Sequence, residues 1–218
     1  MMIEIVERFL SIQGEGLLVG TPAYFIRLAK CNLRCPWCDT KYSWSPGKYV
    51  NVKELALETL SKGVPLVVAT GGEPLLQQEA LARLEAELRD LGFEGIFQIE
   101  TNATIYPKAL EGRNVWLTLS PKVTCDYYVA DVRTVKKVIE NFENVELKLV
   151  ARASDIPCVK KFLKELGEVR VPKILQPLSG EKDYSKASRE LVMKVLEDEE
   201  LRRQFRVIPQ VHKFLKID

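Results

Sequence analysis

The sequence predicts an α/β protein that forms an incomplete, splayed barrel of about six or seven mostly parallel strands with fewer helices. Apolar strand patterns alternate with helical patterns, which is typical of right-handed crossovers in a largely parallel sheet. Polar residues follow several strands at their C-terminal ends, as on the functional face of a barrel. The 218 residues are too few for eight strand–helix units, which need about 250. We therefore expect one domain, residues 1–218.

The composition excludes two classes of partner. Hydrophobic residues make up 46% and charged residues 28%, which is ordinary for a globular protein. No apolar run approaches the ~18 residues that would cross a membrane, so we expect no membrane segment. A formal net charge of +2 gives no basic footprint for nucleic acid.

The first quarter of the chain predicts two strands and an open turn between them. Apolar and polar residues alternate over residues 1–10, and the glycines of Gln13-Gly14-Glu15-Gly16 permit a tight turn. Residues 23–29 have the aromatic and branched bias of a buried strand. Three clustered cysteines begin at Cys31, so a cysteine loop is expected at the C-terminal end of this second strand.

The rest of the chain repeats the order strand, polar turn, helix. Asn51 predicts the N-cap of a helix that runs to about Leu60. A short apolar strand at 66–69 precedes Thr70-Gly71-Gly72-Glu73-Pro74 and a helical pattern to about Leu91. A further helix is expected at 157–166 and a polar surface loop at 181–188. Further strands are expected at 95–99, 115–119, 145–150, 171–175 and 206–208.

The spacing of the cysteines predicts a metal site. Cys31, Cys35 and Cys38 can turn three thiolates inward from one short loop. A structural zinc ion wants four ligands, and neither Cys125, Cys158 nor His212 belongs to a second paired knuckle. An iron–sulfur cubane held by three cysteines keeps one iron free for another ligand. The spacing favours the cluster, with zinc as the alternative.

The remaining cysteines and the only histidine give weaker signals. An odd cysteine number and the lack of a secretory leader predict reduced thiols and a cytoplasmic protein. Cys125 and Cys158 lack paired spacing, so we expect thiols of the core or surface rather than ligands. His212 is either a titrating acid or base or a structural residue.

Cys31, Cys35, Trp37 and Cys38 together resemble the C-x3-C-x-aromatic-C signature of the radical S-adenosylmethionine (SAM) superfamily. The resemblance implies a partial TIM-like barrel and a [4Fe-4S] cluster on the three cysteines, whose open iron chelates SAM. Reductive cleavage of SAM then gives a 5'-deoxyadenosyl radical, while the protein binds, orients and excludes water. It also implies cofactor contacts from Trp37, Cys38 and Asp39.

Two groups of polar residues extend this resemblance. Thr70 to Pro74 could be only a strand-to-helix turn, but it resembles the superfamily's Gly-Gly-Glu-Pro motif, which implies SAM contacts from Gly71, Gly72 and Glu73. Glycines suit close approach of a ligand to the backbone. Further SAM contacts are expected from residues that follow later strands: Ser120, Pro121, Lys122 and Gln176. The alternative is that these residues only form a strand-ending turn or a sheet edge. For Glu100 and Asn102, a functional contact and a structural role are equally expected.

A narrower resemblance covers most of the chain. Residues 11–16, Arg27, Asp39-Thr40, 70–74, 120–122 and 209–213 together resemble the 7-carboxy-7-deazaguanine synthase family. The family implies a homodimeric lyase that converts 6-carboxy-5,6,7,8-tetrahydropterin to 7-carboxy-7-deazaguanine with loss of ammonia, towards queuosine and other deazapurines. It regenerates SAM and uses a reductant such as flavodoxin or ferredoxin. The resemblance implies Mg2+ on Thr40 and pterin contacts from Ile12, Gln13, Gly14, Glu15, Arg27 and Thr70; it names no catalytic residue beyond the cluster.

Arg27 is the residue for which strand geometry adds an independent reason. Period two places Phe25, Arg27 and Ala29 on one face of the strand 23–29. A buried guanidinium must meet an anion or reach water. We expect it to bind the pterin carboxylate, and a structural ion pair with a nearby carboxylate is the alternative.

Two other functional classes stay open on sequence alone. A glycyl-radical activating enzyme would share the cysteines and the Gly-Gly-Glu-Pro turn but would dock a protein substrate. A zinc-stabilised binding module would need no SAM. In some members of the synthase family the C-terminal carboxylate reaches the substrate; here five residues follow Lys213, and whether Asp218 has that role is left open.

Overall fold

The computed structural model describes residues 1–180 and 183–217, in which a nine-stranded sheet curves around an inner cavity. The strand order is β11-β10-β9-β6-β5-β4-β2-β1-β3, and its two ends are not paired with each other within these residues. The parallel strands are β2 (Pro22–Leu28), β4 (Leu66–Gly71), β5 (Ile96–Thr101), β6 (Trp116–Leu119), β9 (Val145–Ala151), β10 (Lys173–Pro177) and β11 (Phe205–Val207). The predicted incomplete, mostly parallel barrel is confirmed.

Two antiparallel additions complete the strands. β1 (Met2–Ile12) pairs with β2, and β3 (Lys48–Asn51) forms the edge beyond β1. β7 (Lys122–Thr124) and β8 (Tyr127–Val129) form a separate hairpin after β6. The sequence did not predict β3 or this hairpin, because strands of three or four residues carry too few alternations to be recognised.

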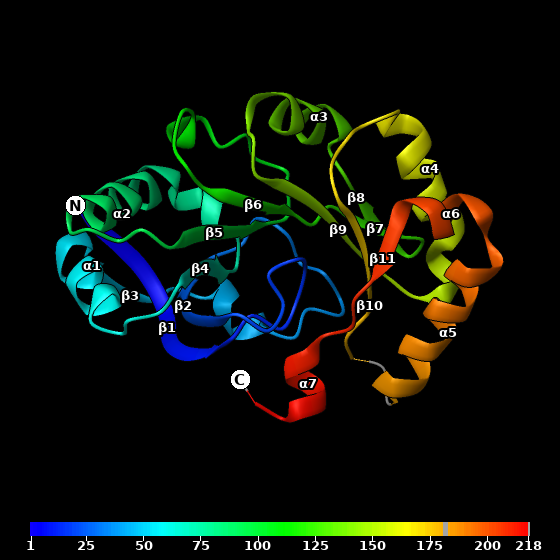
Figure 1. The fold of residues 1–218 in the computed structure, drawn as a ribbon, viewed down its shortest axis with the longest axis horizontal. Helices are drawn as coiled ribbons and strands as arrows, with labels where there is room; N and C mark the ends of the chain where they lie inside the picture. Colours follow the sequence, from blue (N-terminus) through cyan, green and yellow to red (C-terminus); the bar gives the residue numbers. More distant parts are fainter. Residues whose placement is uncertain (181–182, 218) are drawn as a thin grey trace.

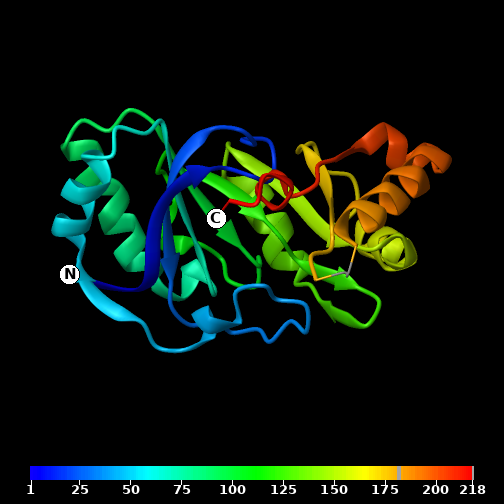
Figure 2. The same ribbon diagram turned by 90° about the horizontal axis from the view of Figure 1, so that it is seen from below.

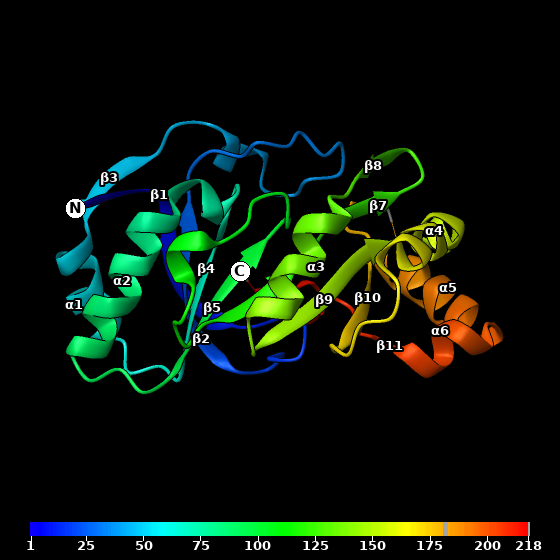
Figure 3. The ribbon, with the colours of Figure 1, turned by 90° about the horizontal axis from the view of Figure 1, so that it is seen from above.

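Helices α1 to α6 lie along the outer side of the curved sheet, whereas α7 lies on its open side (Figures 1 and 3). Their bounds are α1 (Val52–Leu60), α2 (Gln78–Asp90), α3 (Val132–Asn141), α4 (Ile156–Leu166), α5 (Tyr184–Glu197), α6 (Glu199–Gln204) and α7 (Val211–Leu215). Short 3-10 turns are Lys41–Trp44, Pro74–Gln77, Lys108–Leu110 and Ala153–Asp155. No helix in the described chain is long and apolar enough to cross a membrane.

The two faces of the sheet differ in chemistry because side chains alternate along each strand. On β2, Tyr24, Ile26 and Leu28 are buried in the core on the helix side. Phe25 and Arg27 line the inner cavity, as period two predicts. Polar side chains thus collect inside the curve, while the outer face supplies the main apolar core.

The predicted surface loop at 181–188 is wrong for its described residues. α5 begins at Tyr184, and Asp183 caps it by accepting a hydrogen bond from the Lys186 N–H (2.9 Å). Ser188 is buried rather than exposed. An aspartate N-cap gives a polar start to a helix, which composition alone does not distinguish from a loop; residues 181 and 182 lie outside the described chain.

The prediction of reduced thiols is wrong for two of the cysteines. Cys125, at the turn of the β7–β8 hairpin, and Cys158, on α4, form a disulfide across 33 positions of sequence. The Cys125 N–H also donates to Asp155 Oδ1 (3.0 Å), which holds the hairpin turn against the start of α4. Tertiary packing, rather than local spacing, brings these sulfur atoms together.

Candidate functional site

A cavity of about 520 Å3 lies inside the curved sheet, at the C-terminal ends of the parallel strands. It is bordered by the turn after β1, the loop after β2, the turn after β4 and the ends of β5, β6, β9 and β10. α7 borders it near the β1–β2 turn (Figure 2), where the Val211 N–H donates to Gly14 O (3.0 Å). All predicted site residues line this cavity except Glu73 and Pro121.

The cysteine loop, residues 31–38, follows β2 directly and carries three free thiols. Its base is closed where the Lys30 N–H donates to Ser43 O (2.7 Å), and a turn inside it is closed from Cys38 N to Cys35 O (3.1 Å). All three cysteines line the cavity. The loop therefore presents sulfur donors at one end of the cavity.

Two neighbouring elements hold the outer part of this loop. Asn102, at the end of β5, donates through Nδ2 to Asn32 Oδ1 (2.8 Å). The Arg34 N–H donates to the Tyr127 hydroxyl (3.2 Å), and the Tyr127 ring meets Trp37 edge-on at 5.4 Å between centroids. The β7–β8 hairpin and β5 thus fix the loop before any ligand binds.

The three cysteines match the ligand number of a cubane with one open iron. A structural zinc ion takes four protein ligands, one more than this loop supplies. A cubane takes its thiolates on different irons, so the sulfur atoms need not converge on a point. Burial raises the pKa of the Cys31 and Cys35 thiols, so binding a metal cluster there would displace protons.

Gly71 and Gly72 are required by a close backbone contact. A Cβ on Gly71, whose φ is +127°, would lie 2.3 Å from Leu28 O, and one on Gly72 would lie 1.9 Å from Lys30 O. The Glu73 N–H donates to Lys30 O (2.8 Å). The two glycines therefore let the end of β4 approach the chain that leads into the cysteine loop.

The Glu73 carboxylate is turned into the protein rather than towards the cavity. It is fully buried and accepts hydrogen bonds from Leu75 N (2.9 Å), Thr101 Oγ1 (2.7 Å) and Asn102 N (2.7 Å). Burial raises its pKa, against the effect of these donors. The side chain joins the turn after β4 to the end of β5, which in turn holds the cysteine loop.

The polar residues expected after the later strands lie on the cavity wall. Lys122 Nζ donates to Ser120 Oγ (3.1 Å). Gln176 is buried, and its Oε1 has no hydrogen-bond partner in the described chain. Leaving a buried acceptor unpaired costs free energy, so this carbonyl is a ready partner for a ligand N–H or O–H group.

Arg27 forms the ion pair with a nearby carboxylate that was the alternative from the sequence. Its Nε donates to Glu7 Oε1 (2.6 Å), and its Cζ lies over the rings of Phe9 and Tyr42, 5.8 and 5.9 Å from their centroids. Its two terminal nitrogens have no hydrogen bond to a described residue, and Glu7 lines the same cavity. The ion pair thus orients the guanidinium and leaves its outer edge for an anion.

Thr40 and Asp39 lie where the cysteine loop meets α7. Thr40 Oγ1 is 3.6 Å from Cys38 Sγ. Asp39 Oδ2 accepts hydrogen bonds from Ser179 Oγ (3.2 Å) and Lys213 Nζ (3.1 Å). These contacts join the segment after the cysteine loop to the turn after β10 and to α7.

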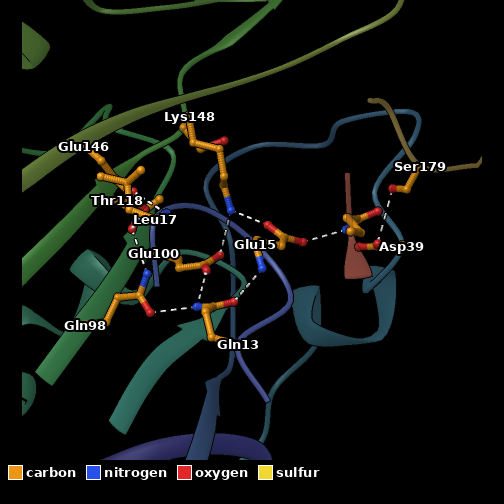
Figure 4. A network of polar contacts seen from close by, with 12 residues as sticks. Gln13, Glu15, Leu17, Asp39, Gln98, Glu100, Thr118, Glu146, Lys148 and Ser179 are labelled. Carbon is orange, nitrogen blue, oxygen red and sulfur yellow. Dashed lines mark hydrogen bonds and ion pairs between the residues drawn. The ribbon is translucent and has the colours of Figure 1, made fainter. Parts of the chain in front are cut away.

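Sequence reasoning missed a polar network inside the barrel (Figure 4). Its centre is the carboxylate cluster, which we define as Glu15, Glu100 and the buried Lys148 between them. Gln13 and Gln210 bond its carboxylates. Alternation of Glu146 and Lys148 in the otherwise apolar strand at 145–150 is the signal that could have revealed it.

His212, on α7, packs against the β1–β2 turn. A Cβ on Gly14 would lie 2.1 Å from His212 Nδ1, so only glycine fits beneath the ring. The histidine lines the cavity, which leaves both of the roles considered for it open. Asp218 lies outside the described residues.

Comparison with known proteins agrees with this geometry. Residues 25–146 match the family model described as Radical SAM superfamily. The chain is 36% identical to the 7-carboxy-7-deazaguanine synthase of Aquifex aeolicus, over 97% of this chain and 93% of that protein. It is 32% identical to the enzyme of the same name from Buchnera aphidicola, with full coverage of both chains. The crystal structure of QueE from Escherichia coli superposes with a TM-score of 0.73 at 29% identity, covering 97% of this chain and 95% of that one.

Proposed function

The chain belongs to the 7-carboxy-7-deazaguanine synthase family of the radical SAM superfamily, and from this premise we propose how its cavity carries out the family's reaction. The enzyme converts 6-carboxy-5,6,7,8-tetrahydropterin to 7-carboxy-7-deazaguanine and releases ammonia, a step of 7-deazapurine biosynthesis. Superfamily membership brings a [4Fe-4S] cluster and SAM with it. The cluster supplies the electron that cleaves SAM, and the protein binds, orients and shields the reactants.

The cysteine loop is the proposed cluster and SAM end of the cavity. Cys31, Cys35 and Cys38 hold the cluster, and the backbone of Gly71-Gly72 receives the methionine part of SAM. Further SAM contacts come from residues already on the cavity wall: Trp37, Asp39, Ser120, Lys122 and Gln176. Glu73 and Pro121 act indirectly, because neither lines the cavity; Glu73 holds the turn that carries the two glycines.

The β1–β2 turn and the inner face of β2 are the proposed pterin end. Arg27 binds the pterin carboxylate through its terminal nitrogens, while Glu7 fixes its Nε. Residues Ile12 to Glu15 and Thr70 complete the contacts to the ring system. In this arrangement the Glu15 carboxylate accepts hydrogen bonds from N–H groups of the pterin ring, and the Arg27 guanidinium binds the pterin carboxylate. The site thereby distinguishes the two ends of the substrate.

Thr40 is the proposed protein ligand of Mg2+. Its hydroxyl oxygen suits a hard cation that keeps several water molecules, and it lies 3.6 Å from Cys38 Sγ on the cavity wall. Magnesium should raise turnover in the wild type, and Thr40→Ala should flatten that response. Identical magnesium titrations of the two proteins would count against Thr40.

The observation that carries this proposal is that three free cysteines and an arginine with unpaired terminal nitrogens line one small-molecule cavity. The test is anaerobic incubation of the reconstituted enzyme with the carboxytetrahydropterin, SAM and a reductant. 7-Carboxy-7-deazaguanine should accumulate well beyond one equivalent of SAM, without stoichiometric 5'-deoxyadenosine. Cleavage of SAM without formation of this product would contradict the assigned substrate.

Two partners and a location complete the proposal. The electron donor is a small redox protein such as a flavodoxin or ferredoxin, the protein acts in the cytoplasm, and it forms a homodimer. The edge strand β3 carries Tyr49, which is 65% exposed, and so offers apolar surface to a second copy. Light scattering of the purified enzyme would test the dimer.

A glycyl-radical activating enzyme is not favoured. Relatives that align along nearly the whole chain share the synthase name. A concave cavity lined by oriented charges suits a small ligand. A zinc module is likewise not favoured, because those relatives carry the name of an enzyme of the radical SAM superfamily.

A further inference from the structure

A buried lysine inside the barrel has no part in the function assigned so far. Lys148 lies on β9 between two aliphatic neighbours, and its side chain is only 4% exposed. Ordering and desolvating an ammonium group is costly unless it is fully paired. Its position facing the cavity therefore calls for an explanation in terms of what it holds.

Lys148 joins two carboxylates from distant parts of the chain. Its Nζ contacts Glu15 Oε2, in the turn after β1, and Glu100 Oε2 (3.1 Å), on β5 (Figure 4). Gln210 Nε2 donates to the other oxygen of Glu15 (2.6 Å), and Gln13 Nε2 donates to that of Glu100 (3.1 Å). Both carboxylates are thus fixed at both oxygens.

The cluster keeps acceptor capacity for a ligand. A carboxylate oxygen can accept two hydrogen bonds, and each of these four oxygens receives one from the described chain. The buried Gln210 Oε1 has no partner among the described residues and also faces this region. The wall therefore presents acceptors, and no complementary donor from the described chain fills them.

The charge of the cluster favours the same kind of ligand. Two carboxylates against one ammonium leave a net charge of about −1 when both are ionised. Lys148 lowers the pKa of Glu15 to about 2 against the opposing effect of burial. Other titratable groups that face the cluster are Glu146 on β9, whose pKa burial raises, His212 on α7 and Tyr184 on α5.

We propose that Lys148 is a positioning residue that holds the Glu15 and Glu100 carboxylates at a fixed spacing, so that together they receive the N–H groups of the substrate's aminopyrimidinone ring. The inference rests on the proposed function, which supplies a pterin to this cavity. Without Lys148 two carboxylates would face each other and one would bind a proton. A protonated carboxyl group donates, so the wall would no longer distinguish an amino group from a carbonyl group.

The test compares two ligands that differ at ring position 2 and in the proton that the neighbouring N1 carries. 6-Carboxypterin carries an amino group there and 6-carboxylumazine a carbonyl group, while both offer a carboxylate to Arg27. Wild-type enzyme, reconstituted with its cluster and SAM, should bind the pterin roughly tenfold or more tightly than the lumazine. Lys148→Met should bring the two dissociation constants to within about twofold of each other, mainly by weakening the pterin.

Two further variants keep the result interpretable. Lys160→Met removes a lysine whose partner is Asp198 outside the cavity (2.5 Å), so its pterin-to-lumazine ratio should equal that of the wild type. If Lys148→Met fails to fold, Glu100→Gln removes one anion while Lys148 keeps Glu15, and the ratio should fall in the same direction.

Three outcomes separate this inference from the function on which it rests. The role of Lys148 would be overturned if the pterin-to-lumazine affinity ratio were unchanged in both Lys148→Met and Glu100→Gln. It would also be overturned if Lys148→Met weakened the binding of both ligands equally, which is what the loss of a merely structural residue would give. Wild-type protein that binds neither ligand and makes no deazaguanine would instead overturn the proposed function itself.

Discussion

The two ends of the cavity are built on opposite plans. At the cysteine loop the thiols have weak contacts with the described chain, such as Leu33 N to Cys31 Sγ at 3.4 Å. At the carboxylate cluster every charged oxygen has a protein donor. The first end is completed by a cofactor from outside, whereas the second is completed by the chain. Removing the cofactor should therefore disable one end and leave the other in place.

The largest effect should come from removing one thiol. Cys35→Ala leaves two anchors for the cluster, so iron content and SAM cleavage should fall to background. Cys125→Ala, which removes a cysteine outside the cavity, is the matched control and should keep its iron. Full iron loading of Cys35→Ala would break the comparison, because the cysteine end would not depend on its thiols.

The cysteine end is also supported by the disulfide, through the hairpin that carries Tyr127. Replacing both Cys125 and Cys158 by Ser should lower the free energy of unfolding by about 3–4 kcal/mol for a loop of this length. Thermal melts of the variant and of the wild type, with and without a thiol reductant, would measure it. A melting temperature indifferent to both changes would show that the hairpin needs no covalent support.

Arg27→Lys tests the pterin end of the cavity separately from the cysteine end. Lysine keeps the charge but loses the planar fork, so binding of 6-carboxypterin should weaken by about 1.5–3 kcal/mol while SAM binding and folding stay unchanged. Arg83→Lys, on α2 and paired with Glu87, serves as the control. Wild-type affinity in Arg27→Lys would assign Arg27 to its ion pair with Glu7 alone.

The last prediction concerns acid stability. The pKa of Glu15 is lowered from 4.5 to about 2, so the folded state binds fewer protons than the unfolded state in this range. Its stabilisation is complete above about pH 4.5 and is lost as the pH falls towards 2. The difference in unfolding free energy between wild type and Glu15→Gln should shrink over this window. A difference independent of pH would show that Lys148 does not hold Glu15 ionised.

The difference between the two ends also explains which site residues could be predicted from the sequence. The cysteine end is local, since its three free thiols lie within one loop, and spacing alone singled them out. Arg27 was singled out because period two isolates it within an apolar strand, and it lines the same cavity. The same period places Glu146 and Lys148 on one face of β9, but their meaning depends on Glu15 and Glu100, which only the sheet order brings near.

Two errors have the same origin in long-range packing. The Cys125–Cys158 pair exists because the hairpin packs on α4, and no local pattern specifies that contact. The start of α5 looked like a loop because its polar residues were judged by composition, without the cap from Asp183. Local chemistry predicted the parallel strands and the longer helices α1, α2 and α4, whereas contacts between elements decided the disulfide and the polar network.

The most direct test of the two-ended cavity is ligand binding to iron-free protein. Calorimetric titrations with SAM and with 6-carboxypterin would be compared between the reconstituted enzyme and the same protein after removal of its cluster. We expect SAM binding to be lost, because its anchor is the cofactor, and the affinity for 6-carboxypterin to change by less than about 1 kcal/mol, because the chain alone completes that end. Loss of both ligands together would contradict the account, since the pterin end would then also depend on the cluster.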